Sequence, residues 1–350
     1  MVRTSKLKIG YSPQVADMSH PADRRRLITW AELRGHKITT DLSARVDAIF
    51  LSGRADFAKI PEYLGRAPVI IDLIDGYLDD AGLVNDYARG VGKVVLGQIS
   101  GPPQRYRTIL SRAISLASAT VCASVEQKDR ISIFTNNCHV ILDFHEEFPF
   151  LPFSELKDKR GHLMWEGQAF TASGLQTLSQ VFTHLIKQEG ISLAAVTDIS
   201  SPRYFGHYGH RLTIDRIKPI PKLFGRDFEI IDWSIANVIE NAKRSNVSII
   251  PLDNDNFLNS LKPENRLLIM WRLGLPCLVS PTLAYSRVMK EAGLDSICQT
   301  EKDWEIKLIE TLRSASLQRV IVEKGQAYIR EKHSLAGTLN KWDEVFEGVL

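Results

Sequence analysis

Residues 260–281, "SLKPENRLLIMWRLGLPCLVSP", place a polar opening directly ahead of an unbroken apolar run. Pro263 suits the first position of a helix, because its missing N–H would have had no partner there. Residues 267–271 are apolar all round, so we expect a buried helix with only its start near solvent. Gly274 then ends the helix, and Pro276 prevents its continuation. The stretch predicts a buried helix that presents a polar start.

Apolar runs on both sides of this helix predict strands, "VSIIPLD" (247–253) before it and "PCLVS" (276–280) after it. Short apolar runs alternate with helix-length segments along the chain, which is typical of an α/β sheet. Because the runs are apolar without a break, we expect parallel sheets covered on both faces. Further strands are predicted at 6–12, 46–52, 67–73, 119–124, 138–143, 162–167, 191–198, 228–233 and 296–300. Helices are predicted at 23–35, 106–117, 175–188, 235–245 and 285–293, and mostly helical chain follows.

The alternation pauses at residues 148–161, "FPFLPFSELKDKRG", which hold two prolines and a charged end. A chain of 350 residues is also about right for two domains. We therefore predict an α/β fold of two tandem Rossmann-like domains, residues 1–152 and 162–333, with 153–161 as linker and 334–350 as a final helix that crosses back to the first domain. Open α/β sheets bind ligands at the carboxyl ends of their strands, so the cleft between the domains is the expected site.

The composition, 44% hydrophobic and 24% charged residues, is that of a soluble globular protein. No stretch reaches the roughly 18 uninterrupted apolar residues of a membrane span, and "MVRTSKLKIGYSP" at the start has no apolar signal core. Four scattered cysteines indicate reduced, buried thiols in a cytoplasmic protein; they are Cys122, Cys138, Cys277 and Cys298. The net charge of +3 is too small to indicate a nucleic-acid partner.

The polar opening itself suits an anion. A helix start carries free backbone N–H groups and a positive partial charge. Lys262 adds a full charge, while Asn265 and Arg266 add hydrogen-bond donors. This arrangement favours a phosphate or sugar hydroxyls at the mouth of the cleft. The alternative is that Lys262 and Glu264 cap a surface helix, and spacing alone does not choose between the two.

The order of three segments resembles a known family. "KPENRLLIMWRLGLPCLVSPTLAYSRVMKEAG" (262–293) is similar to a segment in which a polar loop opens a helix that ends in a G-[LIV]-P-x-[LIV] turn. "IDWSIANVIENAKRSNVSIIPLD" (231–253) resembles the family segment before it, and "HLMWEGQAFTASGLQTL" (162–178) matches the first strand and glycine loop of a nucleotide-binding domain. Together they resemble a GT-B fold glycosyltransferase of the large retaining family that builds bacterial polysaccharides, in a divergent K-x-x-N-R branch.

The sequence departs from that family in its donor-sugar residues. The family commonly has two glutamates eight residues apart, and Leu261 and Ile269 stand in their places. Glu264 is the only carboxylate left in the loop to reach a sugar hydroxyl. The resemblance implies retention at the anomeric carbon, and the missing glutamates leave the stereochemical outcome open.

The glycine loop departs as well. The family's arginine and lysine that grip the donor diphosphate are replaced by Gln168 and Ser173, between Gly167 and Gly174. The remaining candidates to neutralise the diphosphate are Lys262, Arg266, Lys218 and Lys222. A donor with a single phosphate, such as a CMP-sugar, would need less positive charge. Loss of catalysis is a third explanation.

The resemblance implies a metal-independent, hexosyltransferase-type enzyme without a cofactor, in bacterial-type polysaccharide synthesis. It would move a sugar from a UDP-, GDP-, TDP- or CMP-sugar, bound by the second domain, to a glycan or lipid-linked acceptor on the first. A lipid-linked acceptor would bring peripheral contact with the inner face of the membrane. Two other functions stay open: a catalytically degenerate module that binds a sugar nucleotide or a glycan, and a sugar-nucleotide epimerase.

Residues near the donor are assigned by their position in the motifs. The phosphates would be held at the helix start, Glu264 would bind donor hydroxyls, and the backbone near Trp233 would face the base. The residues predicted to contact the donor are Gly167, Gln168, Trp233, Lys262, Asn265, Arg266, Thr282 and Tyr285.

Catalytic candidates follow two strands of the first domain. "PVIIDLIDGYLDD" (68–80) puts Asp72 and Asp75 at a strand end, and "VILDFHEEF" (140–148) ends with Asp143 and His145 close by. A carboxylate or histidine there can take the proton from an acceptor hydroxyl. The predicted catalytic residues are Asp75, His145 and Glu264. The alternative is ordinary helix capping and turn chemistry.

Two further motifs carry weaker signals. "SHPADRRR" (19–26) is either a solvated helix start or a basic segment that faces a lipid-linked phosphate. In "YFGHYGHR" (204–211), His207 and His210 have a spacing that a metal could use. A zinc site needs at least three protein ligands, so no metal site is predicted.

Overall fold

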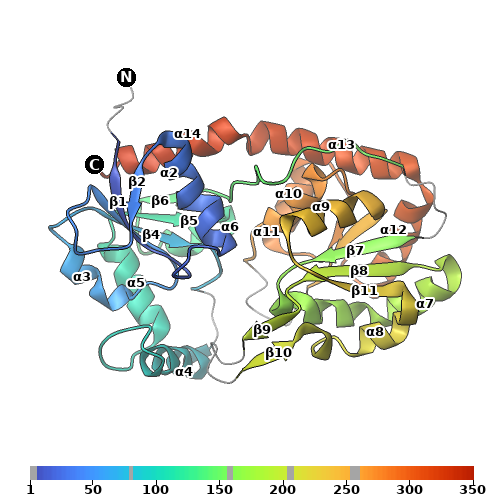
Figure 1. Ribbon diagram of the computed structural model, residues 1–350, viewed down its shortest axis with the longest axis horizontal. Helices are drawn as coiled ribbons and strands as arrows, with labels where there is room; N and C mark the ends of the chain where they lie inside the picture. Colours follow the sequence, from blue (N-terminus) through green and yellow to red (C-terminus); the bar gives the residue numbers. More distant parts are fainter. Residues whose placement is uncertain (1–5, 79–81, 156–160, 203–208, 253–260) are drawn as a thin grey trace. The chain divides into compact units, whose positions relative to one another are not determined.

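The computed structural model describes residues 6–78, 82–155, 161–202, 209–252 and 261–350. The chain forms two compact α/β units, each built on a parallel sheet (Figure 1). Unit 1 contains Met1–His145, Ser260–Pro263 and His333–Leu350, and unit 2 contains Glu146–Asn259 and Glu264–Lys332. The predicted fold class, α/β with two Rossmann-like domains, is confirmed.

The sheet of unit 1 has the strand order β2-β1-β3-β4-β5-β6, and every pair is parallel. Its strands are β1 (Lys8–Ser12), β2 (Lys37–Thr39), β3 (Ala48–Leu51), β4 (Val69–Leu73), β5 (Ala119–Cys122) and β6 (Cys138–Val140). Alternate residues serve two separate cores: Ile49 and Ile71 pack on one face, while Phe50 and Ile70 pack on the other. Both faces are therefore covered, as the unbroken apolar runs predicted.

The helices of unit 1 are α1 (Pro21–Asp23), η1 (Arg24–Ile28), α2 (Thr29–Arg34), η2 (Phe57–Lys59), α3 (Ile60–Tyr63), α4 (Gly82–Val95), α5 (Tyr106–Leu116), α6 (Val125–Ile131) and α14 (Leu335–Glu347). The last helix, α14, completes the core above β1 and β3. Its Phe346 ring stacks on Trp30 with centroids 4.3 Å apart, and Asp343 accepts a hydrogen bond from Trp30 Nε1 at 2.8 Å. The final helix thus belongs to the core of unit 1.

Unit 2 has a five-stranded parallel sheet in the order β11-β8-β7-β12-β13. Its strands are β7 (His162–Glu166), β8 (Ser192–Thr197), β11 (Phe228–Asp232), β12 (Val247–Ile250) and β13 (Cys277–Val279). A small antiparallel pair, β9 (Ser200–Pro202) and β10 (His210–Leu212), was not predicted. The strand predicted at 296–300 is wrong, because only Ile297 bridges to Val279.

The helices of unit 2 are η3 (Ala169–Leu178), α7 (Ser179–Glu189), η5 (Thr213–Asp215), α8 (Pro219–Phe224), η6 (Gly225–Asp227), α9 (Ile235–Arg244), α10 (Asn265–Arg272), α11 (Leu283–Glu291), α12 (Glu301–Arg313) and α13 (Ala315–Lys332). The segment predicted as one helix at 175–188 begins as the 3₁₀ helix η3. A Cβ at Gly174 would overlap the Pro251 carbonyl oxygen, so η3 lies directly against the backbone after β12.

The helix of the opening motif, α10, is buried from Leu267 to Arg272, as predicted. Its predicted start at Pro263 is wrong, since Glu264 is the N-cap and Asn265 the first helical residue. The reason lies in the chain ahead of the proline. Leu261 is 2% exposed and its carbonyl accepts a hydrogen bond from Gln127 Nε2 at 3.2 Å, which anchors the chain in unit 1 just ahead of the helix.

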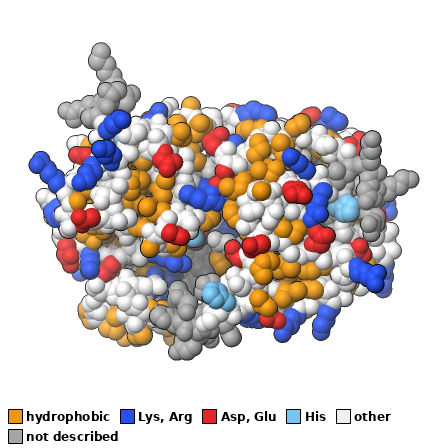
Figure 2. Space-filling view, viewed as in Figure 1, with side chains coloured by type: hydrophobic (Ala, Val, Ile, Leu, Met, Phe, Trp, Pro, Cys, Tyr) orange, Lys and Arg blue, Asp and Glu red, His pale blue; other side chains and the backbone are white. Residues whose placement is uncertain are grey.

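Charged side chains of both signs are interspersed among apolar groups on the face shown in Figure 2. Within the described ranges, no helix combines the length and the hydropathy that are needed to cross a bilayer.

Candidate functional site

The carboxyl edge of the unit 2 sheet is organised by Glu166, the last residue of β7. One carboxylate oxygen accepts a hydrogen bond from Trp233 Nε1 at 2.8 Å, and Trp233 directly follows β11. The other lies 3.5 Å from Arg266 Nε. The Arg266 guanidinium also lies over the Trp165 ring, 5.3 Å from its centre. Glu166 therefore holds an indole and a guanidinium together at the end of the strand.

Gly167 makes this arrangement sterically possible. A Cβ at Gly167 would lie 3.0 Å from both Cζ and Nη2 of Arg266, which is tighter than ordinary packing. The next residue, Gln168, is exposed and precedes η3. The loop after β7 thus passes directly beside the arginine.

The Arg266 guanidinium has an N–H donor without an acceptor in the described part of the chain. Its Nη2 is buried and has no hydrogen-bond acceptor among the residues that the structure describes. The side chain as a whole is 21% exposed. A buried charged donor without an acceptor is uncommon and calls for a partner outside the chain. A guanidinium at the carboxyl edge of a parallel sheet suits a phosphate, which it can bind through two N–H groups.

The other predicted donor residues of unit 2 have structural contacts. Glu264 is 1% exposed, and its carboxylate pairs with Arg287 Nη2 at 3.0 Å. Thr282 caps α11 by accepting a hydrogen bond from the Tyr285 backbone N–H at 3.1 Å. Tyr285 itself is 1% exposed, and Asn265 is the first residue of α10. Contact of these four residues with a sugar nucleotide stays a prediction.

Lys262 groups with unit 1, where its charge acts on Asp75. Asp75 follows β4 and has an exposed side chain. Protein crowds this carboxyl and raises its pKa, and the charges of Lys262 and His20 lower that pKa in part. Sequence reasoning assigned Lys262 to the donor phosphates and did not connect it with Asp75.

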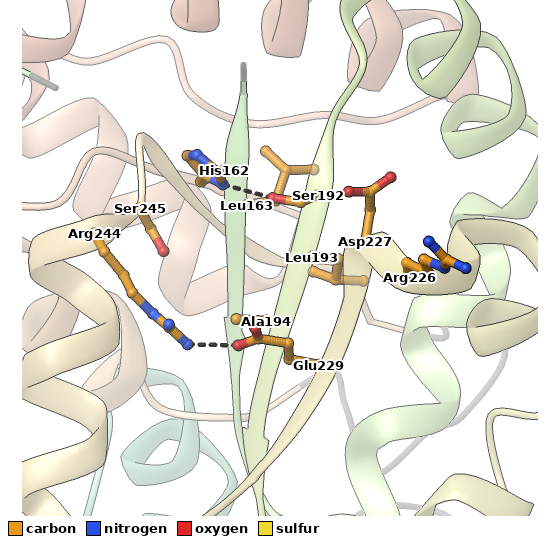
Figure 3. Close-up of a pocket in the computed structure, with 10 residues that line it drawn as sticks. All are labelled: His162, Leu163, Ser192, Leu193, Ala194, Arg226, Asp227, Glu229, Arg244 and Ser245. Atoms are coloured by element: carbon orange, nitrogen blue, oxygen red, sulfur yellow. Dashed lines mark hydrogen bonds and ion pairs between the residues drawn. The ribbon is translucent and has the colours of Figure 1, made fainter. Parts of the chain in front are cut away.

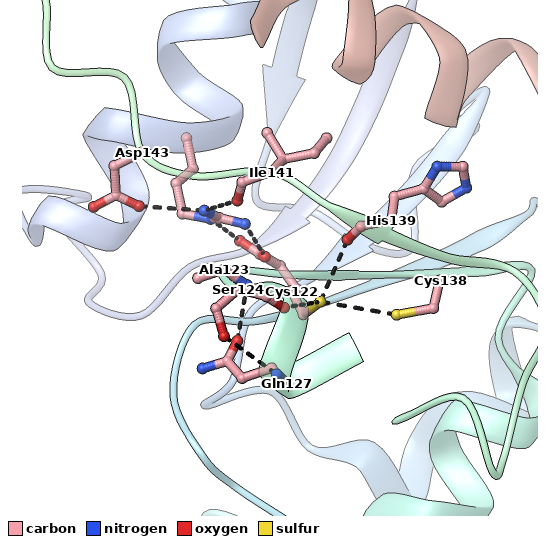
Figure 4. Close-up of polar contacts among 10 residues, drawn as sticks. Cys122, Ala123, Ser124, Gln127, Cys138, His139, Ile141 and Asp143 are labelled. Atoms are coloured by element: carbon pink, nitrogen blue, oxygen red, sulfur yellow. Dashed lines mark hydrogen bonds and ion pairs between the residues drawn. The ribbon is translucent and has the colours of Figure 1, made fainter. Parts of the chain in front are cut away.

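Asp72 and Asp143, at the same edge of unit 1, both pair with Arg26, and Figure 4 labels Asp143 and Ile141 of this network. Arg26 is fully buried and donates to both Asp72 oxygens at 2.6 Å, to the Ile141 carbonyl at 2.7 Å and to Asp143 at 3.2 Å. Burial raises the pKa of Asp72, and Arg26 counteracts that rise. Both readings of "SHPADRRR" are therefore wrong for Arg26, which faces neither solvent nor a ligand.

The segment after β6 leads from unit 1 into unit 2. His145 is 4% exposed, and its predicted catalytic role stays a prediction. The next residue, Glu146, forms a two-point ion pair with the buried Arg272, with both N–O distances at 3.2 Å. Glu146 thus anchors this segment on α10.

One central residue of the unit 2 edge, Glu166, was missed from the sequence. The signal was present, because Glu166 lies near the end of the predicted strand at 162–167, just as Asp75 follows a predicted strand in unit 1. A carboxylate at the carboxyl end of a strand lies at the ligand-binding edge in either domain, so the same pattern indicates Glu166.

No metal centre is indicated in the part of the chain that the structure describes, since no three His, Cys, Asp or Glu side chains gather there to hold an ion. His207 lies outside the described residues, and His210 is exposed on β10. All four cysteines are buried and free, as predicted, and the sulfurs of Cys122 and Cys138 lie 3.8 Å apart.

A cavity of about 360 Å³ lies at the opposite, amino-terminal edge of the unit 2 sheet (Figure 3). Its walls include His162 and Ser192, the first residues of β7 and β8, whose side chains are hydrogen-bonded at 2.6 Å. Arg226 and Arg244 also line it, and Arg244 pairs with Glu229 at 2.6 Å. It contains none of the predicted site residues.

The sequence matches no protein-family model, and no curated protein matches it. Solved structures do resemble the fold. Anabaena HepE in complex with UDP and glucose matches with a TM-score of 0.64 at 10% identity, over 97% of this chain and 99% of that one. WaaG, a glycosyltransferase involved in lipopolysaccharide biosynthesis, matches with a TM-score of 0.57 at 12% identity, over 97% and 99%.

A third neighbour is larger than this chain. S. aureus TarM, solved as a point mutant in complex with fondaparinux, alpha-GlcNAc-glycerol and UDP, matches with a TM-score of 0.60 at 10% identity, over 85% of this chain. The chain spans 55% of the length of that protein. At these identities the likeness shows the fold, which is GT-B.

Proposed function

We propose that the chain is a glycosyltransferase that moves a sugar from a nucleotide-activated donor to a glycan or lipid-linked acceptor. The observation that carries the proposal is Arg266, whose buried Nη2 lacks an acceptor in the described part of the chain and lies against Gly167. This is the edge at which open α/β sheets bind ligands. Support also comes from fold neighbours of this chain that were solved with UDP.

Unit 2 binds the donor in this proposal. Arg266 neutralises the phosphate that leaves with the nucleotide and so takes over from the family's loop arginine and lysine. Glu166 positions Arg266 through their ion pair and holds Trp233 beside it. Because the loop at Gly167 has no side chain there, the phosphate can approach the backbone closely. No metal ion is needed if this cation stabilises the leaving group.

Unit 1 binds the acceptor. The acceptor hydroxyl oxygen forms a bond to the anomeric carbon, while the bond from that carbon to the donor phosphate breaks and its electron pair leaves with the nucleotide. Asp75 takes the hydroxyl proton. Crowding raises the pKa of Asp75, which makes the carboxylate a better base than an unperturbed aspartate.

The proposed setting is cytoplasmic, bacterial-type polysaccharide synthesis, with peripheral contact at the inner membrane face if the acceptor is lipid-linked. The WaaG likeness supports the role in polysaccharide synthesis, because that protein is involved in lipopolysaccharide biosynthesis. The nucleotide is left to experiment among UDP, GDP, TDP and CMP.

Thermal-shift measurements with UDP, GDP, TDP, ADP and CMP test the donor site on wild type, Arg266→Met and the control Arg226→Met. Arg226 is an exposed arginine of the same unit at the opposite sheet edge. A ligand that binds only the folded state adds about 2.7 kcal/mol at a hundred times its dissociation constant. We expect one nucleotide to stabilise wild type and the control but not Arg266→Met. Equal shifts in all three proteins would contradict the assigned role of Arg266.

Incubation with the matching sugar nucleotide then separates the three functions. A transferase releases the nucleotide and attaches the sugar to an added acceptor. An epimerase isomerises the sugar nucleotide without an acceptor, and a binding module leaves it intact. Mass spectrometry of the products reports each outcome, and either of the last two would overturn the proposal.

A further inference from the structure

Three cationic side chains gather at the carboxyl edge of unit 1, and none of them was predicted as a site residue. Arg54 follows β3, while Arg89 and Lys93 lie one turn apart on α4. The Arg89 guanidinium lies 4.4 Å and the Lys93 Nζ 4.8 Å from the centre of the Tyr106 ring. These four residues are called the Tyr106 cluster below.

The cations of the Tyr106 cluster form no ion pair with a carboxylate of the described residues. Within the described ranges, no Asp or Glu lies at ion-pair distance from Arg54, Arg89 or Lys93. Asp86, also on α4, is used by Arg105 at 3.0 Å and by a backbone N–H at 2.9 Å. Like charges four residues apart on a helix destabilise it. Burial, Arg89 and Arg54 together lower the pKa of Lys93 to about 8.

Tyr106 supplies a second, independent sign of a ligand. Its side chain is 1% exposed, and its hydroxyl has no hydrogen-bond partner among the described residues. Buried hydroxyl groups normally have a hydrogen-bond partner. The hydroxyl of a ring that two cations contact therefore calls for an acceptor. That acceptor would have to tolerate the cations, which points to an anionic oxygen.

The helix that carries Arg89 and Lys93 packs closely on neighbouring backbone, and the cluster lies at the carboxyl edge of the sheet. A Cβ at Gly90 would overlap the Gln104 carbonyl oxygen, so α4 lies directly on the backbone that leads into α5. Arg54 follows β3, and Asp75 follows the neighbouring strand β4. Arg89 is near enough for its charge to act on the Asp75 carboxyl.

We propose that the Tyr106 cluster binds an oxyanion, a phosphate or a carboxylate, carried by the acceptor. The proposal rests on the proposed function, in which unit 1 binds the acceptor. Arg54, Arg89 and Lys93 would neutralise the oxyanion, and the Tyr106 hydroxyl would donate to it. The enzyme then selects charged acceptors over neutral ones, with the reacting hydroxyl directed to Asp75.

Calorimetric titration tests the binding directly, in the Arg266→Met background so that the donor site does not contribute. The probes are inorganic pyrophosphate, a galacturonate trisaccharide and the neutral trisaccharide maltotriose. The variants are Arg89→Gln/Lys93→Gln, Tyr106→Phe and the control Arg112→Gln/Lys128→Gln, which removes two cations of the same unit that lie outside the cluster.

We expect at least one anionic probe to bind tenfold or more tightly than maltotriose. The cluster double variant should lose at least tenfold in affinity, Tyr106→Phe a few-fold, and the control nothing. Binding of pyrophosphate but not of the galacturonate would identify a phosphate-bearing acceptor. Binding of the galacturonate but not of pyrophosphate would identify a carboxylate-bearing one. Equal affinity for maltotriose, or no loss in the cluster double variant, would overturn the proposal.

Two further readouts complete the test. The cluster double variant, made in the otherwise wild-type chain, should keep its thermal stability and its nucleotide-induced shift, so a failed donor site is told apart from a failed acceptor site. Anion affinity should also fall as the pH rises through about 8, where Lys93 loses its proton. Tyr106 stays neutral there, because burial raises its pKa to about 12. A Lys93→Gln variant with the same pH dependence would contradict the assignment.

Discussion

Each unit has an arginine at the carboxyl edge of its sheet, and the two arginines differ in their hydrogen-bond partners. Arg26, at the carboxyl edge of the unit 1 sheet, is fully buried, and all three of its guanidinium nitrogens have acceptors. Arg266, at the carboxyl edge of unit 2, has one ion pair at 3.5 Å, and its Nη2 has no acceptor among the described residues. The Arg26 guanidinium is fully hydrogen-bonded within unit 1, whereas the Arg266 guanidinium keeps one donor without an acceptor in the described part of the chain.

The difference follows from the number of acceptor groups that surround each arginine. Asp72 lies near the end of β4 and Asp143 follows β6, so Arg26 ties together parts of the chain on both sides of β5. A buried charge is tolerated only with such a complete set of partners. Arg266 has a single carboxylate, Glu166, which also accepts a hydrogen bond from Trp233. A phosphate would complete the set for Arg266.

The largest expected effect on stability is that of Arg26→Met. This change leaves the buried Asp72 and the half-buried Asp143 without their cation, so we expect a loss of about 3–5 kcal/mol in the free energy of unfolding. Urea unfolding followed by tryptophan fluorescence measures it, since Trp30 and Trp342 lie in the same core. Adding Asp72→Asn should recover part of the loss. A loss below about 1 kcal/mol would show that the network is not structural.

Arg266→Met should affect ligand binding more than stability, in contrast to Arg26→Met. We expect less than about 1 kcal/mol change in unfolding, because the side chain has few partners to lose. Nucleotide affinity should fall roughly 10- to 100-fold, as expected when a hydrogen bond to a charged group is removed. Calorimetric titration measures the affinity, and Arg226→Met serves as the matched control. Unchanged nucleotide affinity in Arg266→Met would contradict a ligand-binding role for this guanidinium.

The two loop glycines give a finer test within unit 2. Gly174 faces the Pro251 backbone, which cannot move away, so Gly174→Ala should cost about 1–3 kcal/mol of stability. Gly167 faces the end of the Arg266 side chain, which can shift by a few tenths of an ångström. Gly167→Ala should therefore weaken nucleotide binding more than folding. Thermal melts and titrations of both variants check this, and equal stability losses would count against it.

The smallest expected effect on stability is that of Asp75→Asn. Crowding raises the pKa of Asp75, so the folded state binds its proton more tightly than the unfolded state does. Through this group, stability falls as the pH rises through the raised pKa. The melting temperature of Asp75→Asn should thus gain on that of wild type as the pH rises from about 4 to about 7. A constant difference across that range would mean that the carboxyl is not perturbed.

Local pattern was enough to predict most strands, because each is a short apolar run bounded by polar residues. It also predicted the burial of α10 and of the four cysteines. The helix start was misplaced by two residues, since Leu261 is held by Gln127, 134 positions away in the sequence. The strand predicted at 296–300 is wrong because this segment forms only a single bridge to β13.

The sequence by itself determined two parallel α/β sheets and the edge at which polar residues gather. Unbroken apolar runs that alternate with helix-length segments predict parallel strands, whose carboxyl ends meet at one edge. Only the tertiary structure decided which of those side chains are paired within the protein. Asp72, Asp75 and Asp143 all lie at or just after strand ends, yet two of them bind Arg26 and one stays exposed. That choice depends on strand order and on contacts across 46 and 117 positions of sequence, which no local pattern encodes.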